Sequence, residues 1–304
     1  MSNYPKILIT AAAGKTGAPV VEQLLERGFP VRAMVRRIDE RAARLQALGA
    51  EIVVGDLHDL ESVRAAVAGV ERVYFCYPPQ LPHLLLAASN MAVAAKDAGV
   101  RALVNMSQIS AREEATSPLA RAHWLSESLF DWADIGAVHV KPTFFAEMLV
   151  LFGAQSVATE GKLYLPYGQE RHAPVAAADI ARVISGVLAD PEPHVGARLV
   201  VTGPRNLTLQ EMADVIGREI GEEVTYVDLP VEAWQEILVE RVGIPEYLAV
   251  HLAEVAKDHQ RGVFSAETDV VERVGGRPPI ALEDFVREAR SLFVTGNVQT
   301  APAA

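Results

Sequence analysis

ILITAAAGKTG, residues 7–17, decides between two kinds of phosphate-binding loop. Its final Gly14-Lys15-Thr16 matches the end of a nucleoside triphosphate P-loop, G-x-x-x-x-G-K-S/T. The first glycine of that motif would fall at Ile9, which lies in an apolar run typical of a buried strand. A wide loop around a β-phosphate needs the backbone freedom of glycine at that place. The GKT triplet is therefore interpreted as accidental.

The same segment fits a dinucleotide-binding turn, in which a strand, a glycine-rich loop and a helix follow directly on one another. Ala11, Gly14 and Gly17 take the three places of G-x-x-G-x-x-G, with alanine in the first. Apolar residues then recur at helical spacing until Gly28, and the helix N-terminus would offer N–H groups to a pyrophosphate. Alanine is less suited than glycine to a positive φ. A plain strand-to-helix connection is the alternative interpretation.

The composition restricts the class of protein. The 304 residues carry a formal net charge of −11, which argues against nucleic acid or an anionic membrane as the main partner. Cys76 is the only cysteine, so an intrachain disulfide is excluded and a reducing compartment is expected. No apolar run approaches the length of a membrane span, and no signal-peptide pattern opens the chain. We expect a soluble, cytoplasmic protein without a metal site.

Short β-rich runs alternate with amphipathic helical segments through the first half of the chain. The expected strands are 6–10, 31–35, 51–54, 72–76, 102–106 and 137–141. Helices are expected at 17–28, 41–48, 60–67, 84–98 and 119–132. This alternation predicts an α/β fold with a doubly wound, Rossmann-type parallel sheet.

The second half of the chain predicts a smaller, helix-rich C-terminal lobe. Thr208 and Glu211 form a capping box that begins a helix extending to about residue 220. A strand at 224–228 and helices at 231–242, 245–259, 267–274 and 282–293 follow. We expect a dinucleotide-binding domain at 1–155, a substrate-cleft lobe at 156–295 that is interleaved with the sheet, and a disordered tail at 296–304.

The end of the second strand, VRAMVRR, bears on the choice of cofactor. An acidic residue near this point would bind the ribose 2′-hydroxyl of NAD. Arg36 stands there instead, 22 residues after Gly14, and Arg37 follows it. A guanidinium suits a 2′-phosphate through charge-assisted, bidentate contacts. The pattern predicts that NADP(H) is preferred and that NAD(H) is possible; an ordinary basic strand end is the alternative.

Two further loops follow predicted strands. In GDLHD, residues 55–59, Asp56 and Leu57 are suited to the adenine, although an acidic residue there could also begin the next helix, a role open to Asp59. In CYPPQ, residues 76–80, the rigid backbone would lie along the nicotinamide half of the cofactor. The cysteine of this loop is interpreted as a small core residue rather than a nucleophile.

Segments along nearly the whole chain, about residues 5–295, resemble one known family. The matching segments are ITAAAGKTG, VRAMVRR, VVGDLHD, FCYPP, LVNMSQ, HWLSES, VKPTFFAEM, AAADIARVI and VTGPRNLTLQEMADVIG. Together they resemble the NmrA-like atypical short-chain dehydrogenases, nearest the quinone oxidoreductase type 2 branch. The resemblance implies NADP(H) binding and a C-terminal lobe that closes over a substrate cleft.

The residues in the matching positions form the expected site. The cofactor contacts are expected at Thr10, Ala11, Ala13, Gly14, Lys15, Thr16, Gly17, Arg36, Arg37, Asp56, Leu57, Tyr77, Pro78, Pro79, Ser107, Pro142 and Phe145. The substrate contacts are expected at Gln108, His123, Phe144 and Met148.

The chain departs from the family at the catalytic motif. Ordinary short-chain dehydrogenases use Tyr-x-x-x-Lys, in which the tyrosine is the general acid; here the matching residues are His123 and Glu127. Met148 stands where many relatives have asparagine. The imidazole of His123 could donate a proton, since its ordinary pKa is about 6.5 and Glu127 is expected to raise it, or the side chain could serve packing alone. Ser107 is expected to orient the substrate, with a turn or helix cap as the alternative.

Hydride transfer needs an acceptor that can hold the new negative charge. A plain ketone becomes an alkoxide and needs a strong proton donor, whereas a quinone becomes a delocalised anion and needs less help. These features predict an NADP(H)-dependent reductase of a quinone or a conjugated, polycyclic aromatic acceptor. An NADP(H)-sensing regulator without turnover and a non-redox biosynthetic auxiliary are the alternatives. The expected partner is a small aromatic molecule, not nucleic acid or membrane, and the protein is expected to be a monomer or homodimer.

Overall fold

The computed structural model describes residues 4–79 and 82–296, and its centre is a seven-stranded parallel sheet. The strands follow the order β3-β2-β1-β4-β5-β6-β8, and every neighbouring pair is parallel. Their bounds are β1 (Ile7–Ile9), β2 (Val31–Val35), β3 (Glu51–Val54), β4 (Arg72–Phe75), β5 (Ala102–Met106), β6 (Ala137–Pro142) and β8 (Arg198–Val201). The predicted doubly wound fold is confirmed.

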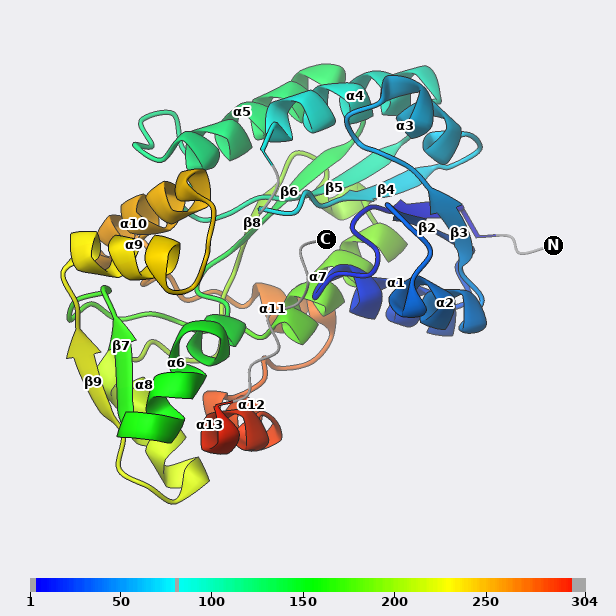
Figure 1. The fold of residues 1–304 in the computed structure, drawn as a ribbon. Helices are drawn as coiled ribbons and strands as arrows, with labels where there is room; N and C mark the ends of the chain where they lie inside the picture. Colours follow the sequence, from blue (N-terminus) through cyan, green and yellow to red (C-terminus); the bar gives the residue numbers. More distant parts are fainter. Residues whose placement is uncertain (1–3, 80–81, 297–304) are drawn as a thin grey trace.

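Helices cover both faces of this sheet (Figure 1). One face carries α1 (Gly17–Glu26), α2 (Glu40–Ala47) and α7 (Ala177–Ala189). The other carries α3 (Leu60–Val67), α4 (Leu84–Asp97) and α5 (Pro118–Ala133). Successive strand residues point to opposite faces, so Ile7 and Ile9 pack into the first layer while Leu8 packs into the second. Burial on both faces explains the uninterrupted apolar runs of the strands.

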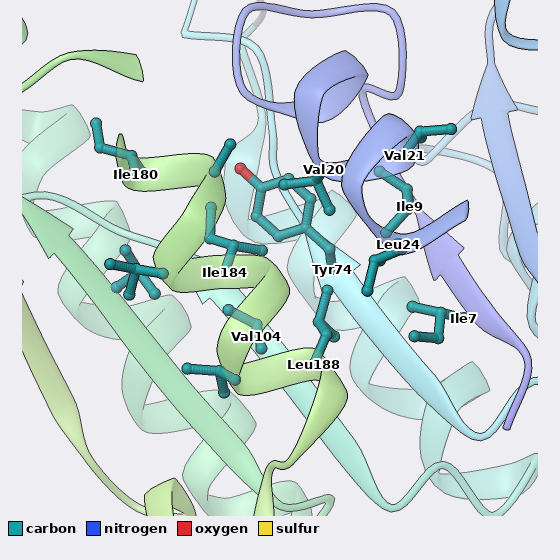
Figure 2. Packing of buried hydrophobic residues seen from close by; sticks show 14 of the residues in the cluster. Ile7, Ile9, Val20, Val21, Leu24, Tyr74, Val104, Ile180, Ile184 and Leu188 are labelled. Carbon is teal, nitrogen blue, oxygen red and sulfur yellow. The ribbon is translucent and has the colours of Figure 1, made fainter. Parts of the chain in front are cut away.

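Tyr74 lies at the centre of the first layer (Figure 2). Its fully buried ring lies among apolar side chains of α1 and α7, such as Val20 and Ile184. Its hydroxyl lies 2.8 Å from the hydroxyl of Thr16, at the N-terminus of α1. Burial raises the pKa of Tyr74, so the phenol stays protonated and the pair is a neutral hydrogen bond.

A second lobe follows the sheet and has its own apolar core (Figure 1). A parallel pair of strands, β7 (Lys162–Leu165) and β9 (Thr225–Asp228), runs through it. The helices of this lobe are α6 (Glu147–Glu160), α8 (Leu209–Ile220), α9 (Val231–Glu240), α10 (Glu246–Gln260), α12 (Leu282–Glu288) and α13 (Arg290–Thr295). The short helix α11 (Val270–Gly275) packs instead against α7 and β8 of the sheet layer, and a 3-10 turn, η1 (Glu192–His194), lies between α7 and β8 in the chain. The predicted capping box of Thr208 and Glu211 is confirmed at the start of α8.

The structure corrects the predicted elements of the second half. The helix expected at 282–293 is two helices with a break at Ala289, and the guanidinium of Arg290 just after the break donates to the backbone oxygens of Glu219 and Ile220 at the end of α8. The elements α6, β7, α7 and β8 were not among those predicted by periodicity. Of the expected tail, residues 297–304 lie outside the described residues. The domain boundary at residue 155 stays a prediction.

None of the helices in the described part of the chain is both long and apolar enough to cross a lipid bilayer.

Candidate active site

The predicted cofactor residues follow the carboxyl ends of six neighbouring strands. Along the sheet, the loops carry Asp56 and Leu57 after β3, Arg36 and Arg37 after β2, residues 10–17 after β1, Tyr77, Pro78 and Pro79 after β4, Ser107 after β5, and Pro142 and Phe145 at and after the end of β6. Parallel strands all end on the same edge of the sheet. The strand order reverses direction between β1 and β4, and ligands of open α/β sheets bind at that point.

The loop after β1 has the backbone of a tight turn. Ala11 has a φ of 46°, the left-handed conformation that glycine adopts more readily. Its carbonyl oxygen accepts a hydrogen bond from the N–H of Gly14 at 2.9 Å. A Cβ on Gly17 would lie 2.3 Å from the same oxygen, whereas a Cβ on Gly14 would lie 3.0 Å from it. Only glycine fits at position 17, and Gly14 is exposed at the surface where a ligand would lie.

Two side chains hold this loop against the sheet. The hydroxyl of Thr10 donates to the carbonyl oxygen of Cys76 at 2.9 Å and accepts from its N–H at 2.8 Å, which ties the ends of β1 and β4 together. Thr16 bonds Tyr74 instead of capping α1 with its side chain. Burial raises the pKa of the Cys76 thiol, so the thiol stays protonated, as expected for a core cysteine.

Positive charge gathers beside the loop. Arg36, Arg37 and Lys15 are exposed at the carboxyl edge of the sheet. A depression of about 360 Å³ lies beside Lys15; it is lined by Ala13, Gly14, Lys15, Ala18, Pro19 and Glu22 from the loop and α1 and by Arg41, Arg44 and Leu45 from α2. Sequence reasoning missed these two arginines of α2. Arg41 and Arg44 lie about one turn apart on α2, six and nine residues after the end of β2, and this spacing is the signal that could have found them.

The loop after β3 carries two carboxylates, Asp56 and Asp59, that make different contacts. Asp59 accepts the backbone N–H of Glu61 and begins α3, the role left open for it. Asp56 accepts the N–H of His58 at 2.9 Å, and its side chain is 62% exposed. The carboxylate of Asp56 is therefore available to a ligand that lies along the carboxyl edge of the sheet.

The loop after β4 is held by Tyr77. Its hydroxyl donates to the carbonyl oxygen of Pro82 and lies 2.7 Å from Nε2 of His58. Burial raises the pKa of Tyr77 to about 12, so the phenol keeps its proton at neutral pH. Pro78 is half-buried and Pro79 is exposed.

The helix α5 carries three polar side chains at successive turns, His123, Glu127 and Asp131, over the ends of β5, β6 and β8. Glu127 is 1% exposed. Ser107 donates its hydroxyl hydrogen to Oε1 of this carboxylate, and the ammonium of Lys141 lies 3.0 Å from the same oxygen.

The other carboxylate oxygen of Glu127, Oε2, faces the half-exposed side chain of Arg198. Nε of Arg198 donates to it at 3.2 Å, and the same guanidinium bonds Asp131 at 2.6 Å. His139 bonds Asp131 at 2.9 Å with its Nε2. A continuous polar network therefore extends from the half-exposed Arg198 to the buried hydroxyl of Ser107.

His123 lies one turn before Glu127 and is 9% exposed. Its Nδ1 has no hydrogen-bond partner among the residues that the structure describes. Burial, followed by the positive charges of His251 and Lys141, lowers the pKa of His123 to about 3. The expectation that Glu127 raises this pKa is therefore wrong, because Lys141 and Arg198 already pair with that carboxylate. At neutral pH the imidazole is uncharged.

The remaining predicted substrate residues lie where the sheet meets the lobe. Gln108 follows Ser107 and is half-buried, as is Met148 on α6. Phe144 is 2% exposed, and its ring packs edge-on against Tyr167, with ring centroids 5.7 Å apart. Phe144 is therefore part of the apolar core of the lobe, and its contact with a substrate stays a prediction.

Sequence reasoning missed Lys141 and Arg198 as site residues. A signal for the first exists in VHVKP, residues 138–142, where His139 and Lys141 alternate with valines and so share one face of a strand. Both are buried under α5. Arg198 could be assigned to the site only once strand β8 was known, and β8 is revealed by its pairing with β6.

Comparison with known families agrees with this geometry, because residues 4–274 match the NmrA-like family. The chain belongs to the NmrA-like family. Its NmrA-like fold spans the sheet, the glycine loop, the polar network and most of the lobe.

Individual NmrA-like relatives are similar along nearly their whole length. An NAD(P)H azoreductase from Xenophilus azovorans is 30% identical, covering 94% of this chain and 99% of the relative. Quinone oxidoreductase 2 from Escherichia coli is 27% identical, covering 92% of this chain and 97% of the relative. The crystal structure of Citrobacter sp. triphenylmethane reductase complexed with NADP(H) has a TM-score of 0.82 at 26% identity, covering 93% of this chain and 99% of that one.

Proposed function

We propose that this NmrA-like protein is an NADPH-dependent reductase whose acceptor is an extended conjugated molecule, such as a quinone, an azo compound or a triarylmethane dye. Bound NADPH would supply the hydride. The loop at residues 10–17 holds the pyrophosphate at the N-terminus of α1, and Arg36 meets the 2′-phosphate. Asp56 reaches the adenine, and Ser107 lies beside the nicotinamide.

One observation carries the choice of acceptor: the hydroxyl groups along the expected nicotinamide path already donate hydrogen bonds to other protein groups. Thr10 and Tyr77 donate to backbone carbonyl oxygens, and Ser107 donates to Glu127. His123 is uncharged at neutral pH because burial lowers its pKa to about 3. A plain ketone needs a proton donor for its alkoxide, so this site favours an acceptor that spreads the charge over a conjugated system.

The relatives support the same chemical class. Their names describe reductases of azo compounds, quinones and triphenylmethane dyes. These acceptors share a delocalised π-system and differ in the atoms that receive the hydride. This shared property suits a site in which the hydroxyls of Thr10, Tyr77 and Ser107 already donate to other groups.

The test is NADPH oxidation with a panel of acceptors, followed at the absorbance of the reduced nicotinamide. We expect turnover with a naphthoquinone, an azo dye or a triarylmethane dye, and none with cyclohexanone. Gly14→Val is the matched control, because a side chain at this exposed position would occupy the place of the pyrophosphate; circular dichroism checks that the variant is folded, since its Cβ would lie 3.0 Å from the carbonyl oxygen of Ala11. Reduction of cyclohexanone at a comparable rate would contradict the proposal. Tight NADPH binding without turnover of any acceptor would support a sensing role instead.

A further inference from the structure

Lys141 makes two contacts with the interior of the protein at the end of β6. Its ammonium lies 3.0 Å from Oε1 of Glu127 and donates to the backbone oxygen of Ala111 at 2.9 Å. The side chain is 10% exposed. A lysine in this environment is costly to bury unless its charge is compensated, and Glu127 compensates it.

The same carboxylate oxygen accepts the hydroxyl of Ser107. A hydroxyl that donates to a carboxylate has only its lone pairs left for other partners. Ser107 therefore faces the carboxyl edge of the sheet as an acceptor, as long as Glu127 is ionised.

We propose that Lys141 and Glu127 are positioning residues: the ammonium keeps the carboxylate ionised, and the carboxylate holds Ser107 as a hydrogen-bond acceptor for the carboxamide N–H of bound NADPH. The inference rests on the proposed function, since it places the nicotinamide beside Ser107. Lys141 acts through its neighbours and touches neither cofactor nor acceptor.

The charged groups around Glu127 determine whether its carboxylate stays ionised when Lys141 is removed. The groups that face it or its partners are Ser107 from β5, His139 and Lys141 from β6, Arg198 from β8, His123 and Asp131 from α5, and His251 from α10. Without Lys141, Oε1 keeps no cation within pairing distance among the described residues, and Arg198 binds only Oε2. Burial then shifts the balance toward the neutral acid, which takes its proton from water, against the remaining ion pair with Arg198.

A protonated Glu127 would reverse the hydrogen bond to Ser107. The carboxyl group would donate to the serine oxygen, and the serine hydrogen would turn toward the cofactor. The O–H of Ser107 would then face the N–H of the carboxamide, two donors without an acceptor between them, and NADPH would bind more weakly. Raising the pH would remove the proton from Glu127 and restore the binding.

The experiment compares NADPH binding by calorimetry in wild type, Lys141→Met, Lys141→Arg and Glu127→Gln, between about pH 7 and pH 9, above the second ionisation of the 2′-phosphate. We expect Lys141→Met to bind about tenfold more weakly at the lower pH and to approach wild type at the higher pH. Lys141→Arg keeps the wild-type affinity throughout, and Glu127→Gln, whose amide oxygen can still accept from Ser107 and Lys141, binds with an affinity that does not change with pH. A pH-independent affinity in Lys141→Met would overturn the proposal.

A spectroscopic measurement follows the proton without cofactor or turnover. Infrared spectra at about pH 8 should show a protonated-carboxyl absorption in Lys141→Met that is absent from wild type, from Lys141→Arg and from the double variant Lys141→Met/Glu127→Gln, since exposed carboxyls are ionised there. Absence of the band from Lys141→Met also overturns the proposal. If the band and the pH-dependent NADPH binding are both found but no acceptor is reduced, the proposed function fails and the positioning roles stand.

Discussion

The hydroxyl of Tyr74 lies 2.8 Å from the hydroxyl of Thr16 and joins the middle of the sheet to the start of α1. Tyr74 is fully buried between α1 and α7 (Figure 2), and its hydroxyl reaches Thr16 in the loop after β1. Thr16 lies within the loop that we propose as the pyrophosphate site. The contact therefore couples the packing of the core to the position of the cofactor loop.

Tyr74→Phe removes this hydrogen bond from the hydroxyl of Thr16, a residue that is 8% exposed. We expect the free energy of unfolding to fall by about 1–2 kcal/mol, the usual cost of an unsatisfied buried hydroxyl. Urea denaturation measures it, as a lower midpoint at an unchanged slope. Thr16→Ser keeps the hydroxyl and is the matched control. An unchanged midpoint for Tyr74→Phe would show that the bond does not contribute to stability.

Ala11→Gly should stabilise the protein. Ala11 has a φ of 46°, a conformation that costs a residue with a Cβ about 1–2 kcal/mol. Glycine removes this cost but makes the unfolded chain more flexible, so we expect a net gain of roughly 0.5–1 kcal/mol in the free energy of unfolding. Ala12→Gly, at a buried position without a positive φ, should destabilise instead. Equal losses in both variants would refute the strain at position 11.

Arg36→Ala should lower the preference for NADPH over NADH. One charge-assisted contact with the 2′-phosphate accounts for a tenfold preference, which corresponds to about 1.4 kcal/mol. Calorimetry with both cofactors measures the ratio, and NADH affinity should change little. Arg101→Ala is the control, since this exposed arginine precedes β5 at the opposite edge of the sheet. If Arg36→Ala keeps the wild-type ratio, the 2′-phosphate lies elsewhere, with the α2 arginines the next to test.

Stability should fall as the pH is lowered, because burial lowers the pKa of His172 to about 4 from an ordinary 6.5. The unfolded chain binds the proton first, so the stabilisation is complete above about pH 6.5 and is lost as the pH falls toward 4. Between pH 7 and 5 this residue accounts for about 2 kcal/mol. In His172→Leu the pH dependence of the unfolding free energy should shrink by that amount.

Phe264→Leu is the matched control for the histidine variant. Phe264 stacks on His259 with ring centroids 3.6 Å apart, and His259 lies 4.8 Å from His172 in the same aromatic cluster. The substitution removes packing but no ionisable group, so it should lower stability by a similar amount at every pH. A pH dependence in His172→Leu equal to that of wild type would mean that the histidine is not the group being protonated.

Local patterns determined the first half of this protein. The strand Ile7–Ile9, the turn with Gly14 and Gly17 and the helix after it are all contained within about twenty residues, and each depends on neighbours in the chain. The alternation of strands and helices then led to the doubly wound sheet, because parallel strands need helical crossovers. The capping box at Thr208 was predictable for the same reason.

Only the tertiary structure decided the chemistry beside Ser107. Glu127, Lys141 and Arg198 come from α5, β6 and β8, and the edge strand β8 is recognisable only through its pairing with β6. The pKa of His123 likewise depends on burial and on charges from distant segments, which is why the sequence pattern predicted the wrong direction. Ionisation is set by the solvent and charges in three dimensions, whereas the turn, the strand and the cap are set by the backbone and its nearest neighbours.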